Sequence, residues 1–235
     1  MRRQIKGLLY FFGTDIRRSL AIFYTILLAI LVISLVITYF LARVDNGDGM
    51  FTVSLTGPMY VYCAIFGFVS VKEFVPFSIK MGATRKNLFV STGVFYLALS
   101  FLMAVAASIL QELVMAFMKT AGIELFSFLH PAYFLNNTWY TRIVMDTSIM
   151  FFFFVIMFVL GLLFYKYGLA GAGSVLGALV VIMLLGIAQG WLIDFIIDLF
   201  ADIEMTFFYQ LFGMGLLFYG ISFLLLRRIT TVIVK

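Results

Sequence analysis

The stretch Lys72–Leu88, KEFVPFSIKMGATRKNL, is a polar and basic interruption in an otherwise apolar chain. Proline is tolerated in the first turn of a helix because the N–H that it lacks would have no partner there, so Pro76 can open a short helix. Gly82 can close this helix by adopting a left-handed conformation after the last turn. The stretch therefore predicts a short helix over about 76–81, between two long apolar segments.

The side chains of this stretch predict a docking element. Phe77 and Met81 stand one helical turn apart and are expected to share an apolar face. Thr84 is a candidate N-cap for the next helix, whose first turn then holds Arg85 and Lys86. Two cations at a helix N-terminus oppose the helix dipole, which suggests that lipid headgroups or an acidic protein surface bind them. The alternative is an ordinary cytoplasmic loop held by its positive charge.

The composition indicates a polytopic membrane protein. Of 235 residues, 64% are hydrophobic and 11% are charged, and the mean hydropathy is +1.14. These values lie far outside the range of soluble domains. A span needs about 20 apolar residues, so six spans occupy roughly 120 residues and leave no room for a second globular domain. The one cysteine and the one histidine, Cys63 and His130, are too few for a disulfide framework or a conventional zinc site.

The hydrophobic pattern predicts an all-α protein with a single transmembrane domain over 1–235. Its first residues carry five cations around an apolar patch, which is typical of an interfacial helix. A secretory signal is the rival interpretation, but the next apolar run is too long for a signal core and lacks a cleavage site. The expected elements are the interfacial helix 1–18 and the spans 20–42, 57–71, 88–118, 142–165, 169–189 and 207–226.

The distribution of charge predicts which ends of the spans face the cytoplasm. All of the 16 Lys and Arg residues except Arg43, Lys119 and Arg142 fall on one side of this topology. Among the acidic residues, only Asp15 and Glu73 fall on that side. The positive-inside rule then places both termini in the cytoplasm. The same rule accounts for the net charge of +5 without a nucleic-acid partner.

Two further patterns are candidates for packing and for a polar path. Gly173 and Gly177 form a GxxxG pair, which would let another helix approach closely, although small residues are also common in membrane helices generally. After the fifth span, the segment GWLIDFIIDLFADIE places an aspartate at every fourth position, so a helix would align them on one face. This stripe and two acidic residues near the outer ends of spans are candidate gate or substrate-path residues. They are Asp194, Asp198, Asp202, Glu112 and Asp146.

The sequence offers no catalytic constellation. It contains no Walker A sequence, no GxSxG, no HExxH and no intramembrane Glu and His pair of the kind that a membrane metalloprotease needs. We therefore expect no catalytic residue, no metal site and no enzymatic activity in this chain. The spans also lack charges at mid-membrane depth, which mark proton-coupled carriers. Any uphill transport would take its energy from another protein.

The chain resembles the ABC-2 type permease subunits of bacterial ABC exporters. The text KEFVPFSIKMGATRKNLF is similar to the family pattern of a Glu after the second span followed by a Gly-x-[Ser/Thr]-Arg run into the third. The resemblance covers the whole chain in architecture, but only Glu73 to Leu88 in letters. It implies that this stretch is a coupling helix docked on a separate ATPase subunit. The implied contact residues are Glu73, Pro76, Phe77, Lys80, Met81, Gly82, Arg85 and Lys86.

The resemblance also implies the remaining parts of an exporter in a bacterial plasma membrane. Two ATPase subunits would hold ATP and Mg, and a second permease copy or a sister subunit would complete the path among membrane lipids. The acidic segment would correspond to partly re-entrant outer helices that close the path. This chain itself would hold no cofactor. Peptides, drugs or other amphipathic compounds are the expected substrates, and the lack of a sizeable extracellular domain leaves their identity open.

Two other functions fit the same composition. One is the substrate-binding membrane subunit of an energy-coupling importer, but such subunits dock through small residues on the first span, and this span has bulky Ile, Leu and Val there. The other is a membrane component outside transport, such as an immunity or sensor protein. An ATPase with a Walker A motif encoded beside this chain would favour the exporter.

Overall fold

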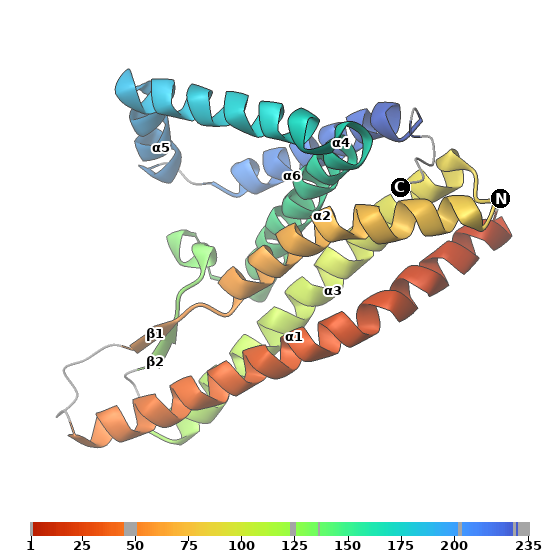
Figure 1. Cartoon of the computed structure of the whole chain (residues 1–235). Helices are drawn as coiled ribbons and strands as arrows, with labels where there is room; N and C mark the ends of the chain where they lie inside the picture. Colours follow the sequence, from red (N-terminus) through yellow and green to blue (C-terminus); the bar gives the residue numbers. More distant parts are fainter. Residues whose placement is uncertain are drawn as a thin grey trace.

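The computed structural model describes residues 2–44, 51–122, 126–135, 137–201, 204–227 and 229. Within these ranges the chain is almost entirely helical, with one short pair of strands and one 3-10 turn (Figure 1). The elements in chain order are α1 (Arg2–Val44), β1 (Phe51–Val53), α2 (Thr56–Lys80), α3 (Arg85–Thr120), β2 (Phe126–Phe128), η1 (Pro131–Phe134), α4 (Trp139–Ala188), α5 (Trp191–Ala201) and α6 (Met205–Arg227).

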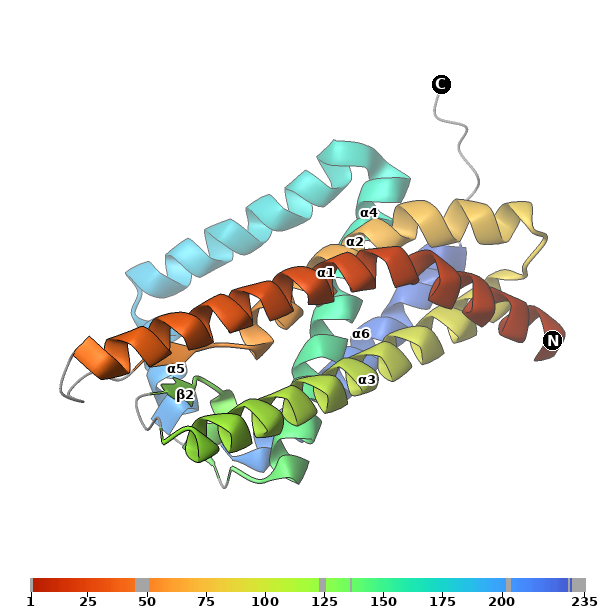
Figure 2. The same ribbon diagram turned by 90° about the horizontal axis from the view of Figure 1, so that it is seen from below.

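Five of the helices, α1, α2, α3, α4 and α6, are long and apolar enough to cross a membrane. The predicted all-α membrane class is therefore confirmed in its coarse form. The helices of membrane length number five because α4, which is 50 residues long, consists of two helices joined across a kink, one for each of the predicted segments 142–165 and 169–189. Gly168 interrupts this helix with a φ of 68° and a ψ of −161°, and the helix turns back there (Figures 1 and 2). Such a positive φ strains any residue with a side chain, so glycine suits this position.

The predicted separate interfacial helix is wrong. Residues 2–44 form the single 43-residue helix α1, with no break between the expected interfacial segment and the first span. Leu8, Phe12 and Ile16 lie on one face and are buried against other helices of the chain. The ring of Phe12 stacks on Phe74 of α2 with the centroids 3.9 Å apart. This face of the segment thus packs against protein, because α2 and α3 offer the aromatic partners Phe74 and Phe95.

The bundle has two chemically different ends. The start of α1, the α2–α3 turn, the bend of α4 and the end of α6 lie toward one end, which we call the basic end (Figure 1). The strands, η1 and α5 lie toward the other, which we call the strand end. There β1 pairs in parallel with β2, with Phe51 opposite Phe126. The predicted turn over 43–50 lies largely outside the described residues.

The core is built where α2, α3 and α4 cross. A Cβ atom added at Gly67 of α2 would lie 2.6 Å from the backbone oxygen of Phe154 on α4, so the two backbones approach as closely as glycine allows. The buried Tyr96 of α3 stacks on the ring of Phe154, with the centroids 5.0 Å apart. Its hydroxyl also forms a 2.5 Å hydrogen bond with Ser70 of α2. These contacts lock the three helices together.

Helix α6 closes the bundle against the first half of α4 and against α3. A Cβ at Gly93 of α3 would lie 2.6 Å from the ring of Tyr219, whose hydroxyl donates to the backbone oxygen of Phe89. At the basic end, Arg85 donates from its Nη1 atom to the backbone oxygens of Leu226 and Arg227, at 3.3 and 2.9 Å. The carbonyls at the end of a helix carry partial negative charge, so a guanidinium stabilises them.

Candidate functional site

The α2–α3 corner, which we define as residues 77–86, is a closed helix-to-helix turn at the basic end. Gly82 has a φ of 73°, and its N–H donates to the oxygen of Ile79 at 3.0 Å. The N–H of Ala83 donates to the oxygen of Ser78 at 2.9 Å, which completes the double hydrogen bond of a Schellman motif. The prediction that Gly82 ends a helix is confirmed.

The helix that Gly82 ends is α2 itself, so the predicted separate short helix is wrong. Pro76 lies inside α2 and does not open a new helix. Proline removes one hydrogen bond from a helix interior, but long membrane helices accommodate such a loss where neighbouring groups compensate. The next helix begins as expected, because Thr84 caps α3 by accepting a hydrogen bond from the Asn87 N–H at 3.3 Å.

The side chains of the corner divide into a buried set and an exposed set. Phe77 faces inward, where its ring stacks on Phe11 of α1 at a centroid distance of 3.7 Å and an angle of 12°. Met81 is instead 66% exposed, and Lys80 and Lys86 are also exposed. Phe77 and Met81 therefore do not share one exposed apolar face, because α1 covers the first of them.

The remaining predicted docking residues lie around this turn. Arg85 is half-buried and is already held by the carbonyls at the end of α6. The exposed Glu73 lies within hydrogen-bonding reach of Asp15 on α1. Beside the corner, a cavity of about 290 Å³ separates Met81 from the first turns of α1. Its lining residues are Arg3, Gln4, Gly7, Leu8, Met81 and Ala83. Met81 is thus the apolar side chain of the corner that is most available to a partner.

A second polar site lies toward the strand end, where Asp146 of α4 is buried with 1% of its surface exposed. The hydroxyl of Tyr60 on α2 donates to its Oδ1 atom at 2.5 Å. The Nε2 atom of His130 lies 3.1 Å from Oδ1 and 3.2 Å from Oδ2. His130 precedes η1, so this one carboxyl group joins α2, α4 and the η1 segment. We call Tyr60, His130 and Asp146 the carboxyl cluster.

The hydrogen bonds of His130 define its tautomer. Its Nδ1 atom accepts from the backbone N–H of Ala132 at 2.9 Å, so that nitrogen carries no proton. In the neutral ring the proton is then on Nε2, which donates to Asp146. Two neutral donors thus satisfy the buried carboxyl group, as buried polar groups require. The cluster positions helices and holds a proton donor beside a carboxyl.

One turn before Asp146, Arg142 is also buried, and it forms an ion pair with the exposed Glu112 of α3. Its Nε atom has no hydrogen-bond partner in the described part of the chain. Glu112 and Asp146 were predicted as path residues, whereas their partners Tyr60, His130 and Arg142 were not predicted. The spacing of Arg142 and Asp146, four residues apart, was a usable signal, because it places both on one face of a helix.

The other predicted path and packing residues lie on exposed surfaces. Asp194 and Asp198 are exposed on α5, whereas Asp202 lies outside the described residues. A Cβ added at Gly173 or Gly177 would meet no atom within 4 Å. The described chain therefore supplies no helix that packs closely against this GxxxG pair. The close helix contacts of the chain instead use glycines that the sequence reasoning did not select, such as Gly67.

The described residues contain no group of three or more His, Cys, Asp and Glu side chains that could hold a metal ion. The exposed basic corner at one end of α2 and the buried carboxyl cluster toward its other end are the candidate functional sites among the predicted residues. No protein-family model, curated protein or solved structure matches this chain.

Proposed function

We propose that this chain is the transmembrane subunit of an ATP-driven exporter in a bacterial plasma membrane. It forms half of a translocation path with a second copy or a sister subunit. Two separate ATPase subunits, which bind ATP and Mg, dock at the α2–α3 corner. The substrates are peptides, drugs or other amphipathic compounds. In this arrangement α4 crosses the membrane twice, on either side of Gly168, so the chain has six spans.

The observation that carries this proposal is the continuity of α2. One unbroken helix connects the exposed corner at Lys80 with Tyr60, which is bonded to Asp146. Twenty residues at 1.5 Å each make a lever of about 30 Å, the thickness of the hydrocarbon core. A displacement of the α2–α3 corner would therefore move α2 as a rigid body and displace Tyr60 in the carboxyl cluster. A loop between span and corner would not transmit force in this way.

The charge at the basic end supports a cytoplasmic location for the corner. The α2–α3 corner holds Lys80 and Lys86, the bend of α4 holds Lys166, and the end of α6 holds Arg227; all three places lie at the basic end. Cytoplasmic ends of spans carry an excess of Lys and Arg. Both termini are then cytoplasmic, on the side where ATP is available to a partner ATPase.

The second half of α4 supports an assembly larger than one chain. Nearly all of its described side chains are exposed, with Ala172 and Gly186 as the buried exceptions. Lipid could cover such an apolar helix, but its GxxxG pair has open space before it and suits a second helix. We therefore assign this face to the second permease.

A crosslinking experiment tests the docking site. Cys63, the chain's single cysteine, is fully buried, so a Met81→Cys variant in native membranes carries one reactive thiol. A maleimide photo-crosslinker at this position should trap a soluble protein that contains a Walker A motif, and ATP should change the yield. The same crosslinker on Asn137→Cys, an exposed position toward the strand end, is the control. Equal trapping at both positions, or no ATPase among the products at position 81, would overturn the proposal.

A further inference from the structure

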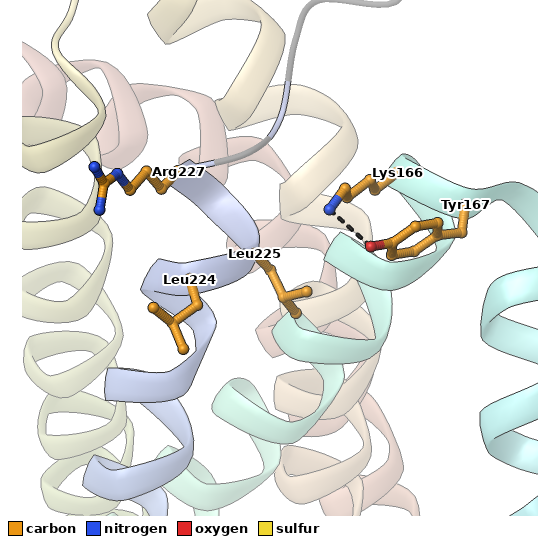
Figure 3. A pocket seen from close by; sticks show the side chains of 5 residues that line it. All are labelled: Lys166, Tyr167, Leu224, Leu225 and Arg227. Carbon is orange, nitrogen blue, oxygen red and sulfur yellow. Dashed lines mark hydrogen bonds between the residues drawn. The ribbon is translucent and has the colours of Figure 1, made fainter.

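A cavity of about 610 Å³ lies between the bend of α4 and the last turn of α6. Its lining combines two cations, one phenol and two leucines (Figure 3). The residues are Lys166, Tyr167, Leu224, Leu225 and Arg227. Neither the α2–α3 corner nor the carboxyl cluster contributes to it.

The cations of this cavity lack an acidic partner. The Nζ atom of Lys166 donates to the hydroxyl of Tyr167 at 2.7 Å and lies 4.5 Å from the centre of its ring, which leaves further N–H donors free. Among the described residues, neither Lys166 nor Arg227 forms an ion pair. Two positive charges that border one cavity without a carboxylate favour an anion in it.

The carbonyls at the end of α6 would normally repel an anion at this position. Arg85 removes much of that repulsion, because its guanidinium binds the backbone oxygens of Leu226 and Arg227. Arg85 also adds a third positive charge near the same helix end. The local field at the cavity therefore favours negative charge in spite of the helix dipole.

The apolar part of the cavity determines the kind of anion. Leu224 is 63% exposed, and Leu169, just beyond the bend of α4, is 77% exposed. Both cations belong to the ends of membrane-length helix segments, so we expect them at headgroup depth, and Leu224 lies about one turn further into α6. A soluble phosphate would use only the cations. A lipid with a phosphate headgroup would use the cations and cover the leucines as well.

We propose that this cavity binds an anionic phospholipid, with its phosphate on Lys166 and Tyr167 and an acyl chain along Leu224. Arg227 adds positive charge at the edge of the cavity, although its guanidinium points away from Lys166 (Figure 3). Basic pockets between membrane helices are suited to such headgroups. The lipid would join the bend of α4 to the end of α6, which are otherwise separated by the cavity. It would therefore stabilise the angle at Gly168.

The test uses the purified full-length chain in detergent with phosphatidylglycerol or phosphatidylcholine. Native mass spectrometry counts the retained lipids, and thermal unfolding measures the stabilisation that each gives. We expect retention of phosphatidylglycerol over phosphatidylcholine. The double variant Lys166→Gln, Arg227→Gln should lose this preference about 25-fold, since each cation near an anionic headgroup contributes about a factor of five. Gln keeps much of the side-chain length, so packing changes little.

A matched control removes two other cations. Lys72→Gln with Lys80→Gln changes the net charge equally, but both exposed residues lie outside the cavity. This control should keep the wild-type lipid preference. An equal loss in both double variants would show a general charge effect and would overturn the proposed site.

Water-soluble glycerol phosphate distinguishes a lipid from a free phosphate. It should compete weakly, because it cannot cover Leu224, and Leu224→Gln should weaken lipid retention without the loss of a cation. Full competition by glycerol phosphate would instead assign the cavity to a soluble anion. Retention without any preference between the two lipids would also overturn the proposal. These outcomes do not depend on whether an ATPase binds the chain.

Discussion

The rings of Phe11 on α1 and Phe77 on α2 lie face to face, with their centroids 3.7 Å apart. This stack places Phe77 inside the α1–α2 contact, next to the exposed Met81. The two apolar residues of the corner therefore have separable roles. One stabilises the fold of the chain, and the other is available to a partner.

Phe77→Ala should lower the free energy of unfolding by about 2 kcal/mol, because it removes a stacked aromatic ring from a helix contact. Met81→Ala should change it by less than about 0.5 kcal/mol, as expected of an exposed side chain. Thermal unfolding of the two purified variants gives the comparison. Under the proposed function, Met81→Asp should also abolish transport-coupled ATP hydrolysis at unchanged stability. Equal destabilisation by both alanine variants would contradict the division of roles.

The hydrogen bond from Tyr60 to Asp146 should contribute to stability through a measurable coupling. Tyr60→Phe should cost about 1–2 kcal/mol, because a buried acceptor loses one of its donors. A double-mutant cycle with Asp146→Ala, which removes the acceptor, isolates the pair, and we expect an interaction energy of about 1 kcal/mol. Tyr140→Phe is the control, since its hydroxyl contacts Tyr209 at 3.1 Å on an exposed surface. If Tyr140→Phe lowers the free energy of unfolding as much as Tyr60→Phe does, burial does not increase the contribution of the Tyr60 hydrogen bond to stability.

The glycines of the α2–α4 contact and of the GxxxG pair should respond differently to a methyl group. Gly67→Ala should destabilise the chain by about 1–3 kcal/mol, because its Cβ would lie 2.6 Å from a backbone oxygen. Gly173→Ala should leave the isolated chain at least as stable, since the position faces open space and alanine favours helix. Unfolding measurements on both variants make the comparison.

Substitution of Gly173 should also affect the proposed contact with a second permease. Gly173→Leu should reduce the yield of crosslinked permease pairs in membranes without reducing the amount of folded chain. A pair yield equal to that of the unmodified chain would show that the GxxxG face contacts lipid instead.

Thiol labelling should report the proposed orientation of the two ends. Cys63 is buried and should not react, so single substitutions can be compared directly. In intact cells, a membrane-impermeant maleimide should label Asn137→Cys and should label Met81→Cys only after the membrane is opened. Labelling at position 81 from outside would reverse the topology and exclude a corner that docks a cytoplasmic ATPase.

The exposed aspartates of α5 should act on charged cargo if the proposed exporter function is right. Asp194 and Asp198 lie one turn apart on an otherwise apolar helix, so their negative field would attract cationic substrate at the exit. Asp194→Asn with Asp198→Asn should lower export of basic peptides more than export of neutral ones. High salt should weaken the difference by screening. An equal loss for both kinds of cargo would leave the aspartates as a solvated face only.

Local features of the chain were predictable because neighbouring residues determine them. The long apolar runs identify the membrane-length helices, and Gly82 and Thr84 fix where α2 ends and where α3 begins. Helix caps need only a few adjacent residues, so they can be recognised without a partner element. The kink of α4 at Gly168 coincides with the boundary between the predicted segments 142–165 and 169–189.

Tertiary partners were not predictable in the same way. Phe12 belongs to a segment with the pattern of a lipid-facing helix, but it stacks on Phe74, more than 60 residues away in sequence. An apolar face does not specify whether lipid or protein covers it. The sequence around Pro76 likewise favours the start of a helix, yet Pro76 lies inside α2. The carboxyl cluster required His130 and Tyr60 to meet Asp146, which only the folded chain reveals.

The packing of α6 also has a consequence for how the chain is made. This helix is synthesised after α3 and α4, yet Tyr219 packs on Gly93, and Arg85 binds the backbone of Leu226 and Arg227. Until α6 has been made, the residues of α3 and α4 that face it lack these contacts. Chains truncated before Met205 should therefore be more sensitive to membrane proteases than the full-length chain, because incompletely packed helices expose more of their surface.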